Sequence, residues 1–347
     1  MILILSQADG EPTTEWVMDW LDALGVPFLR LNGEDLDGLS GGPGLGVRID
    51  AGRAGPEVAV TFAGPHEEPL PFPAEAVTAV WYRRWQASGC VAALPLLPPG
   101  APDPRGAAFT IRRHLSFELW KLSETLFSRF AAVPWLSDPA HDSPNKLKVL
   151  ETAAHHGLEV PATLVTTRRH DLERFAERHG TLITKSIGEP EMFFFEKDFF
   201  MLYTAEVGPE EITALPDRFF PSLFQERLEK KYEIRVFFLD GRCYPMAIFS
   251  QLDARTQVDF RRYNRKRPNR TVPYRLPAEI EAKIAALMAS LELETGSLDL
   301  IRTPDGRHVF LEVNPIGQFG MVSRPCNYFL ERRVAEVLAR KGAHVQT

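Results

Sequence analysis

The sequence is poor in cysteine and has no long hydrophobic run. Its three cysteines, Cys90, Cys243 and Cys326, lie far apart in 347 residues, and no two have the C-x-x-C spacing. This pattern supports neither a disulfide framework nor a zinc site, and a reducing cytoplasm fits it best. No apolar run approaches the ~18 residues of a membrane span, and the opening MILIL is too short for a signal peptide. We therefore expect a cytoplasmic protein without a membrane partner.

An overall positive charge is also absent. The chain has 40 Lys and Arg against 46 Asp and Glu, a net charge of −6, which argues against a nucleic-acid binder. The exception is a local run of basic residues: Arg261, Arg262, Arg265, Lys266, Arg267 and Arg270. Such a run is either a solvated loop or a site for phosphates or an acidic partner, and the composition leaves both interpretations open.

The first third of the chain alternates strand-like and helix-like patterns. MILIL reads as a buried strand, Val17 and Leu21 recur at helical spacing before Gly25, and VPFLRL reads as a second strand. This order predicts a βαβ unit with a parallel sheet. A long helix is expected from about residue 107 to 130. We therefore expect a Rossmann-like domain over residues 1–133.

The remainder predicts two further regions. Ser143 as N-cap, with Pro144 at the first helical position, indicates a helix that ends at Gly157. Two strands follow, and the second places Lys185 at its end. A hairpin turns at Asp240-Gly241, and a terminal helix is expected over about 327–341. The fold class is α/β, with α+β character in the C-terminal part, and the expected boundaries are 134–224 and 225–347.

The segment SLDLIRTPDGRHVFLEVNPIGQFG places three oxygen-bearing side chains, Asp299, Glu312 and Asn314, around one predicted hairpin. Strand alternation puts Glu312 and Asn314 on one face. The same alternation places Phe310 with them and assigns Val309, Leu311 and Val313 to the other face. Two facing carboxylates would repel, and a divalent cation such as Mg²⁺ would remove that conflict. The alternative is an acid that faces water beside an Asn that ends the strand.

The register of this hairpin depends on its turn. If Asp305-Gly306 forms a two-residue turn, Asp299 lies directly opposite Glu312. If Pro304-Asp305-Gly306 forms a three-residue loop with a bulge, the pairing shifts by one and Asp299 turns away. The metal interpretation therefore requires an even loop, or a bulge that restores the facing.

Several motifs in sequence order resemble those of the ATP-grasp ligases. They are SPNKLKVLETAAHHGLEVPAT, LITKS, FQERLEKKYEIRVFFLDG, VDFRRYN, SLDLI and FLEVNP. The resemblance covers roughly residues 134–330 and implies an ATP-grasp fold behind a Rossmann-like pre-ATP-grasp domain. WYRR and the tail EVNPIGQFGMVSRPCNYFLE are most similar to the microviridin-type and grasp-with-spasm (graspetide) ligases, which join side chains within a ribosomally made precursor peptide.

The resemblance implies ATP and Mg²⁺ as cofactors and assigns roles to particular residues. Nucleotide contacts fall on Lys146, Lys185, Gln225, Glu226, Arg227, Leu228 and, for the ribose, Glu233. Magnesium ligands fall on Asp299, Glu312 and Asn314, and arginines near the transferring phosphate on Arg235 and Arg261. The basic residues left to attract an acidic peptide are Arg262, Arg265, Lys266, Arg267 and Arg270. One departure is that the segment after Lys185 has a single glycine where the family has a glycine-rich loop.

The expected function is an ATP-dependent ligase. It would activate Asp or Glu side chains of a precursor peptide, with a leader and an acidic core containing Ser or Thr, as acyl phosphates. Ser or Thr hydroxyls or Lys amines would then displace phosphate to form ester or amide rings. The alternatives are a RimK-like ligase that adds an amino acid or amine to a carboxylate, and a non-catalytic nucleotide-binding module. The resemblance also implies a homodimer, although the sequence itself does not reveal the oligomeric state.

Overall fold

A computed structural model describes residues 1–36, 44–52, 55–63, 70–71, 74–85, 91, 94, 96, 106–188, 192–195, 198–201, 204–252 and 268–343. The chain forms two compact units, here called unit 1 (Met1–Pro139 with Leu330–Thr347) and unit 2 (Ala140–Phe329). Among these described residues, no helix is long and apolar enough to cross a membrane. The expected boundary between residues 224 and 225 stays a prediction.

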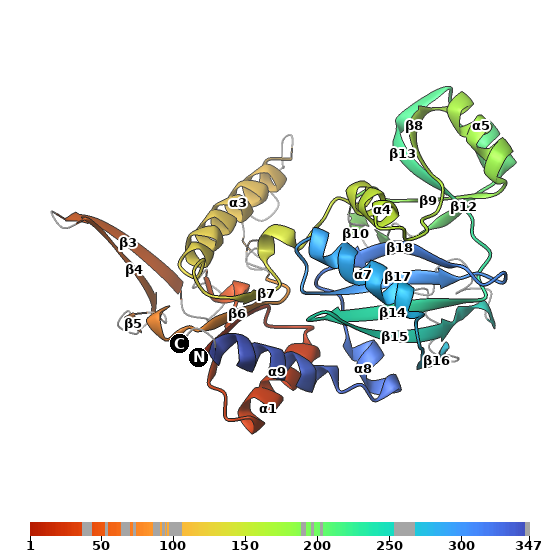
Figure 1. Cartoon of the computed structure of the whole chain (residues 1–347). Helices are drawn as coiled ribbons and strands as arrows, with labels where there is room; N and C mark the ends of the chain where they lie inside the picture. Colours follow the sequence, from red (N-terminus) through yellow and green to blue (C-terminus); the bar gives the residue numbers. More distant parts are fainter. Residues whose placement is uncertain are drawn as a thin grey trace. The chain divides into compact units, whose positions relative to one another are not determined.

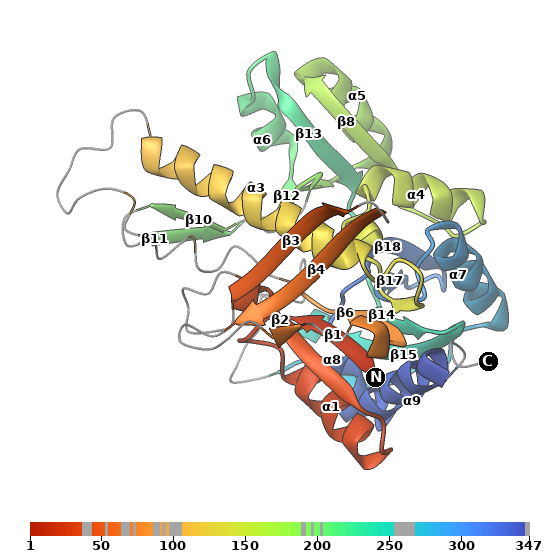
Figure 2. The ribbon, with the colours of Figure 1, turned by 90° about the vertical axis from the view of Figure 1, so that its left-hand side faces the viewer.

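Unit 1 is built on a parallel sheet in the order β2-β1-β6-β7. β1 pairs in parallel with both β2 and β6, as a βαβ unit requires. A second sheet consists of β3, β4 and β5, and Figure 2 shows β3 and β4 as a long ribbon. The elements are β1 (Ile2–Ser6), α1 (Pro12–Ala23), β2 (Phe28–Asn32), β3 (Gly44–Gly52), β4 (Gly55–Ala63), β5 (Leu70–Pro71), β6 (Ala79–Tyr82), α3 (Ala107–Ser128), β7 (Trp135–Leu136) and α9 (Leu330–Ala343).

The last helix of the chain completes unit 1. α9 lies beside α1 in Figures 1 and 2 and buries Val334, Ala335 and Leu338. At Gly342 an added Cβ would lie 2.9 Å from atoms of both Ile2 and Thr78, so the helix approaches the start of the chain closely. The single terminal helix predicted from residue 327 is wrong at its start. Positive φ angles at Asn327 and Phe329 separate α9 from a shorter helix, α8 (Gly320–Cys326).

Unit 2 contains a five-stranded sheet in the order β16-β15-β14-β17-β18. α4 and α7 pack on one face and form its core with Val149, Leu150, Ile284, Leu287 and Phe310. The other face carries the polar residues described below. The elements are α4 (Lys146–His155), β14 (Tyr232–Leu239), β15 (Arg242–Phe249), β16 (Arg270–Pro273), α7 (Ala278–Ser290), β17 (Thr295–Arg302), β18 (His308–Asn314) and α8 (Gly320–Cys326).

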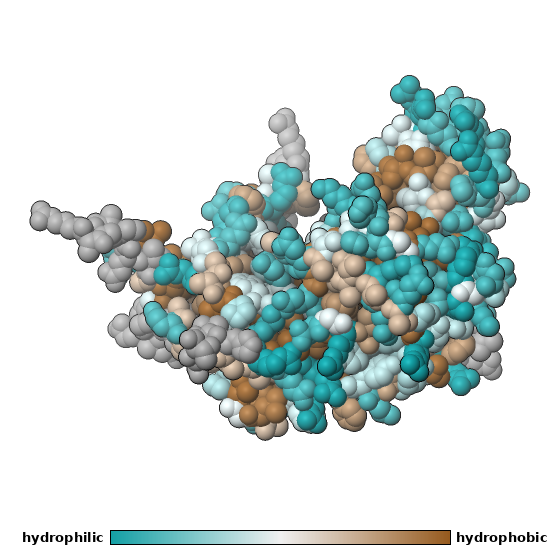
Figure 3. Space-filling view, viewed as in Figure 1, coloured by the Kyte–Doolittle hydropathy of each residue, from teal (hydrophilic) through white to brown (hydrophobic). Residues whose placement is uncertain are grey.

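A second sheet of unit 2 has the order β12-β9-β13-β8. One face packs on α5 and α6 around Leu172, Ile212 and Phe224. Val165 and Phe220 remain 39% and 85% exposed, and Figure 3 shows hydrophobic residues gathered over β8 and β13. The elements are β8 (Thr163–Arg168), α5 (Arg169–His179), β9 (Leu182–Lys185), β12 (Ala205–Val207), α6 (Pro209–Ala214) and β13 (Arg218–Glu226), with the separate hairpin β10 (Met192–Phe195) and β11 (Asp198–Met201).

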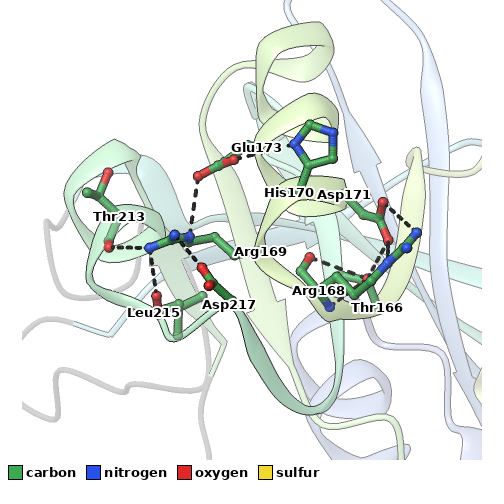
Figure 4. Close-up of polar contacts among 9 residues, drawn as sticks. All are labelled: Thr166, Arg168, Arg169, His170, Asp171, Glu173, Thr213, Leu215 and Asp217. Atoms are coloured by element: carbon green, nitrogen blue, oxygen red, sulfur yellow. Dashed lines mark hydrogen bonds and ion pairs between the residues drawn. The ribbon is translucent and has the colours of Figure 1, made fainter.

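An arginine at the start of α5 binds the segment that joins α6 to β13. The Arg169 guanidinium donates to the carbonyl oxygens of Thr213 and Leu215 and pairs with Asp217, as Figure 4 shows. Arg169 is the first residue of α5, and its partners lie at the end of α6 and before β13. The contacts therefore fix the segment that leads into β13, the strand that carries Gln225 and Glu226.

The start of α4 differs from the prediction. Asn145, rather than Ser143, is the N-cap, and its side-chain oxygen accepts hydrogen bonds from the backbone N–H groups of Leu147 and Lys148. Asn is among the strongest N-cap residues, so the helix begins after Pro144 instead of at it. Lys146 is consequently the first helical residue.

Candidate functional site: a cleft between two sheets

A cleft lies between the two sheets of unit 2 and encloses about 1020 Å³, including its open mouth. Most residues predicted to bind nucleotide or metal line it: Lys185, Gln225, Glu226, Arg227, Leu228, Glu233, Asp299 and Glu312. Others that the sequence analysis missed line it too: Pro161, Ile183, Thr204, Glu229, Lys230, Gln251, Leu300, Ile301 and Leu311. Segments more than 100 residues apart in the sequence therefore meet at one site.

The facing of Asp299 and Glu312 is confirmed, but not through a two-residue turn. Thr303 N–H donates to Arg307 O at 3.1 Å around the three-residue loop Pro304–Gly306, and Gly306 has φ +97°. This odd loop pairs Leu300 with Phe310. A bulge at Leu311 then shifts the register, so that Asp299 pairs with Glu312 and Ser297 with Asn314. Two irregularities thus restore the arrangement that an even loop would have produced.

The bulge also corrects the predicted faces of β18. Phe310 belongs to the core beneath the sheet, with Val313 packed against the same core, while Leu311 and Glu312 both line the cleft. Strict alternation had placed Phe310 with Glu312, which is wrong. The reason is that a bulge puts two successive residues on one side of the strand.

Each of the two facing carboxylates has a cationic partner. Arg235 Nη1 lies 3.2 and 3.1 Å from the two Asp299 oxygens, and Lys185 Nζ lies 3.6 Å from Glu312 Oε2. The Arg235 Nε–H is buried and makes no hydrogen bond in the part of the chain that the structure describes. Asp299, Glu312 and Lys185 therefore line the cleft together, and Arg235 reaches Asp299 from outside the cleft wall with one donor unused.

The oxygen donors suit a hard divalent cation. Two carboxylates and an amide are the ligand types that Mg²⁺ takes in proteins when it also binds substrate phosphates. Ser297 Oγ, on the same rung as Asn314, is buried and lacks a hydrogen bond within the described ranges. Within those ranges no group of three or more His, Cys, Asp or Glu is placed to hold a metal. The donor set fits a cation shared with phosphates better than a cage made by the protein alone.

A tight turn follows the metal candidates. Gly317 N–H donates to Asn314 O at 3.0 Å, which folds the chain back over β17. A Cβ at Gly317 would lie 2.3 Å from the Ser297 side chain, so only glycine fits. The glycine in NPIG therefore determines where the chain leaves Asn314.

The linker between the sheets runs along the edge of the cleft. Gln225 is buried and its amide donates to Thr163 Oγ1 at 2.9 Å, while Glu226 Oε1 accepts from the Ala162 N–H at 2.8 Å. The Leu228 N–H makes no hydrogen bond among the described residues. Within the described residues the linker therefore has an unused backbone donor, at a residue that lines the cleft.

The Glu233 carboxylate is buried within the cleft wall. Burial raises the pKa of Glu233, while Lys230, through its charge and hydrogen bond, and the Ser250 hydroxyl oppose that rise. Lys230 Nζ lies 2.6 Å from Glu233 Oε1, and Ser250 Oγ lies 3.0 Å from the same oxygen. Lys230 was not predicted, and its only sequence signal is its spacing of three residues from Glu233.

The remaining predicted residues are not part of the cleft wall. Arg235 pairs with Asp299, and Asn314 is exposed at the end of β18. Lys146 does not line the cleft; its Nζ donates to Gly188 O at 2.9 Å, three residues after Lys185. Arg270 is exposed at the start of β16, with its guanidinium 5.5 Å from the Phe249 ring centroid. Arg261, Arg262, Arg265, Lys266 and Arg267 lie outside the described residues.

Comparison with known proteins supports the fold. No family model and no curated protein matches the chain. Among solved structures, the chain is similar to macrocyclase MdnC bound with precursor peptide MdnA from Microcystis aeruginosa MRC, with TM-score 0.76 and 23% identity over 98% of this chain and 99% of that one. It is also similar to a Chryseobacterium gregarium RiPP-associated ATP-grasp ligase in complex with ADP and a leader and core peptide, with TM-score 0.79 and 23% identity over 98% and 96%.

Macrocyclase MdnB from Microcystis aeruginosa MRC is similar as well, with TM-score 0.69 and 25% identity over 97% of this chain and 98% of that one. The chain therefore has the ATP-grasp fold over nearly its whole length, as the motif order predicted. The three similar structures named here are two macrocyclases, one of them bound with a precursor peptide, and a RiPP-associated ATP-grasp ligase.

Proposed function

We propose that the protein is an ATP-dependent, ADP-forming ligase that cross-links side chains of a ribosomally made precursor peptide. The observation that carries this proposal is the cleft, in which the facing carboxylates Asp299 and Glu312 lie with Lys185 and apolar side chains, in a chain with the fold of such enzymes. The reaction would occur in the cytoplasm, where ATP is supplied.

The adenine ring would lie in the apolar part of the cleft. Ile183 from β9 and Leu311 from β18 line the two sides, and the Leu228 N–H supplies a donor at the linker edge. Flat aromatic rings gain most when both faces contact apolar side chains. Glu233 would accept hydrogen bonds from the ribose.

The phosphates would lie beside Lys185 and Arg235, with Lys146 next to the segment that follows Lys185. Bound Mg²⁺, held by Asp299, Glu312 and Asn314, would neutralise charge on the phosphates. Arg235 offers a planar fork and an unused buried donor, which suits a phosphoryl group. Arg261 has the same assignment on sequence grounds alone.

The chemistry consists of two balanced steps. An Asp or Glu carboxylate of the peptide attacks the γ-phosphorus of ATP, and ADP leaves. A Ser or Thr hydroxyl, or a Lys amine, of the same peptide attacks the acyl carbon and phosphate leaves, with loss of one proton from the nucleophile. Such chemistry depends on positioning and on charge neutralisation more than on a protein nucleophile. On sequence grounds, Arg262, Arg265, Lys266, Arg267 and Arg270 would attract the acidic peptide.

Mass spectrometry of a precursor incubated with the protein and MgATP tests the proposal. Each ring formed removes one water from the peptide, and the Asp299→Asn variant serves as the inactive control. ADP release with an unchanged peptide mass would contradict cross-linking. A mass that rises by an added amino acid or amine would instead identify a RimK-like ligase, and absence of ATP consumption would indicate a binding module.

A further inference from the structure

The Glu233 carboxylate is held at one of its two oxygens. Oε1 accepts from Lys230 Nζ at 2.6 Å and from Ser250 Oγ at 3.0 Å. The side chains of Lys230 and Glu233 are 10% and 9% exposed, and Ser250 is fully buried. Oε2 makes no hydrogen bond within the described part of the chain, and Glu233 lines the cleft.

The linker turns one lysine toward the cleft and the next away from it. Lys230 lines the cleft, whereas the Lys231 side chain is exposed and is not part of the cleft wall. The Lys231 backbone N–H donates to Arg302 O at 2.8 Å, which fixes the chain between the two lysines. The position of the Lys230 ammonium therefore follows from the path of the backbone.

A buried carboxylate stays ionised only when cations or donors compensate its lost hydration. An ionised carboxylate only accepts hydrogen bonds, so it suits the two adjacent hydroxyls of a ribose, which can both donate. With Oε1 occupied by Lys230 and Ser250, the other oxygen is the acceptor that remains for a ligand. Ser250 also restricts the rotation of the carboxylate because it binds from β15's side, away from the linker.

We propose that Lys230 and Ser250 are positioning residues that hold Glu233 as a fixed acceptor for the 2′- and 3′-hydroxyls of the nucleotide. The cleft is thereby selective for ribonucleotides over nucleotides that lack these hydroxyls. This inference rests on the proposed nucleotide site. It adds two residues, neither of which would contact the transferred phosphate.

Calorimetric titration of the full chain with two ligands, MgADP and Mg-2′,3′-dideoxy-ADP, tests it. Lys230→Met should weaken MgADP binding by roughly ten-fold, because a charge-assisted arrangement is lost, and should leave dideoxy-ADP binding unchanged. Ser250→Ala should act in the same direction with a smaller effect. Lys231→Met is the matched control, because it removes the same charge from a side chain outside the cleft, and should change neither affinity.

The outcomes separate the inference from the function on which it rests. A wild-type chain that binds neither ligand overturns both. Only the positioning role is overturned if the wild-type chain prefers MgADP but Lys230→Met lowers the affinity for both ligands equally, or for neither. Lys230→Arg, which keeps the cation, should retain most of the preference for MgADP. Dideoxy-ADP binding also reports that each variant keeps a folded cleft.

Discussion

At the scale of single residues, three partly or fully buried acids of the cleft each pair with a cation. Asp299 pairs with Arg235, Glu312 with Lys185 and Glu233 with Lys230. Unpaired buried charges are costly, so the pairs stabilise the nucleotide-free chain. The phosphates of a bound nucleotide would pair with the cations and release the two facing carboxylates for Mg²⁺. The paired side chains would then stabilise the fold when no nucleotide is bound, and bind the nucleotide and its metal when it is.

Lys185→Met tests this exchange. Without the ammonium, Glu312 carries more uncompensated charge, so the affinity for Mn²⁺ alone should rise. The affinity for MnADP should fall, because the phosphates lose a cation. Electron paramagnetic resonance of free Mn²⁺, with and without ADP, measures both. Lys148→Met, on an exposed position of α4, should change neither value, and a parallel fall of both affinities in Lys185→Met would contradict the exchange.

His308 predicts a pH dependence of stability. Arg302 Nη1 lies 3.1 Å from Nδ1, and because arginine only donates, Nδ1 accepts and Nε2–H donates to Tyr274 at 3.0 Å. Burial, and then the Arg302 charge, lower the pKa of His308 below 6.5. A lowered pKa means that the stabilisation is complete above pH 6.5 and is lost as pH falls through the folded-state value.

Urea unfolding between pH 8 and pH 5.5 checks this expectation. Each unit by which the pKa is lowered corresponds to about 1.4 kcal/mol. The stability advantage of the wild type over His308→Phe should shrink as pH falls, and the comparison cancels the other eight histidines. A constant difference across this range would show that His308 does not titrate with unfolding.

At the scale of elements, register was the part that the sequence left open. The facing of Asp299 and Glu312 depended on the length of the turn. No residue type in the three-residue loop or at Leu311 requires a bulge, so the sequence did not reveal the register shift. The Asp240-Gly241 hairpin was predictable because its turn pair is specific, and both residues have positive φ. Lys230 was missed because its one sequence signal, the three-residue spacing from Glu233, does not show which of the two adjacent lysines turns inward.

Deletion of Leu311 tests what the bulge contributes. Without it, Phe310 would still face the core and Glu312 would still pair with Asp299, because the bulge is the single register shift between β17 and β18 within the described residues. We therefore expect a folded chain whose ADP affinity falls by about ten-fold or more, since a buried Leu contact is worth about 1.5–3 kcal/mol. Leu311→Ala should lower affinity less. A deletion variant that fails to fold would show that the bulge is needed for the sheet itself.

At the scale of the whole molecule, the order of the motifs predicted the ATP-grasp fold although no single motif was specific. Order carries this information because the cleft assembles strands from distant parts of the chain. Which segments of the chain make up unit 1 was not predictable in the same way. α9 follows the metal candidates in sequence after α8, and its packing against α1 and Ile2 depends on contacts across the full length of the chain.

This organisation predicts separable effects on the two units. Gly342→Leu should destabilise unit 1, because even a Cβ would lie 2.9 Å from Ile2 and Thr78, and overpacking of this kind costs roughly 1–3 kcal/mol. MgADP should stabilise unit 2, which contains the cleft, by mass action. Each unit has its own hydrophobic core, so scanning calorimetry of the full chain should resolve two transitions.

Gly342→Leu should lower the midpoint temperature of the unit 1 transition, and MgADP should raise that of the unit 2 transition. Gly241→Leu, at an open turn in unit 2, should not alter the unit 1 transition. A single transition that moves with both perturbations would contradict this division, because it would mean that the chain unfolds as one cooperative body.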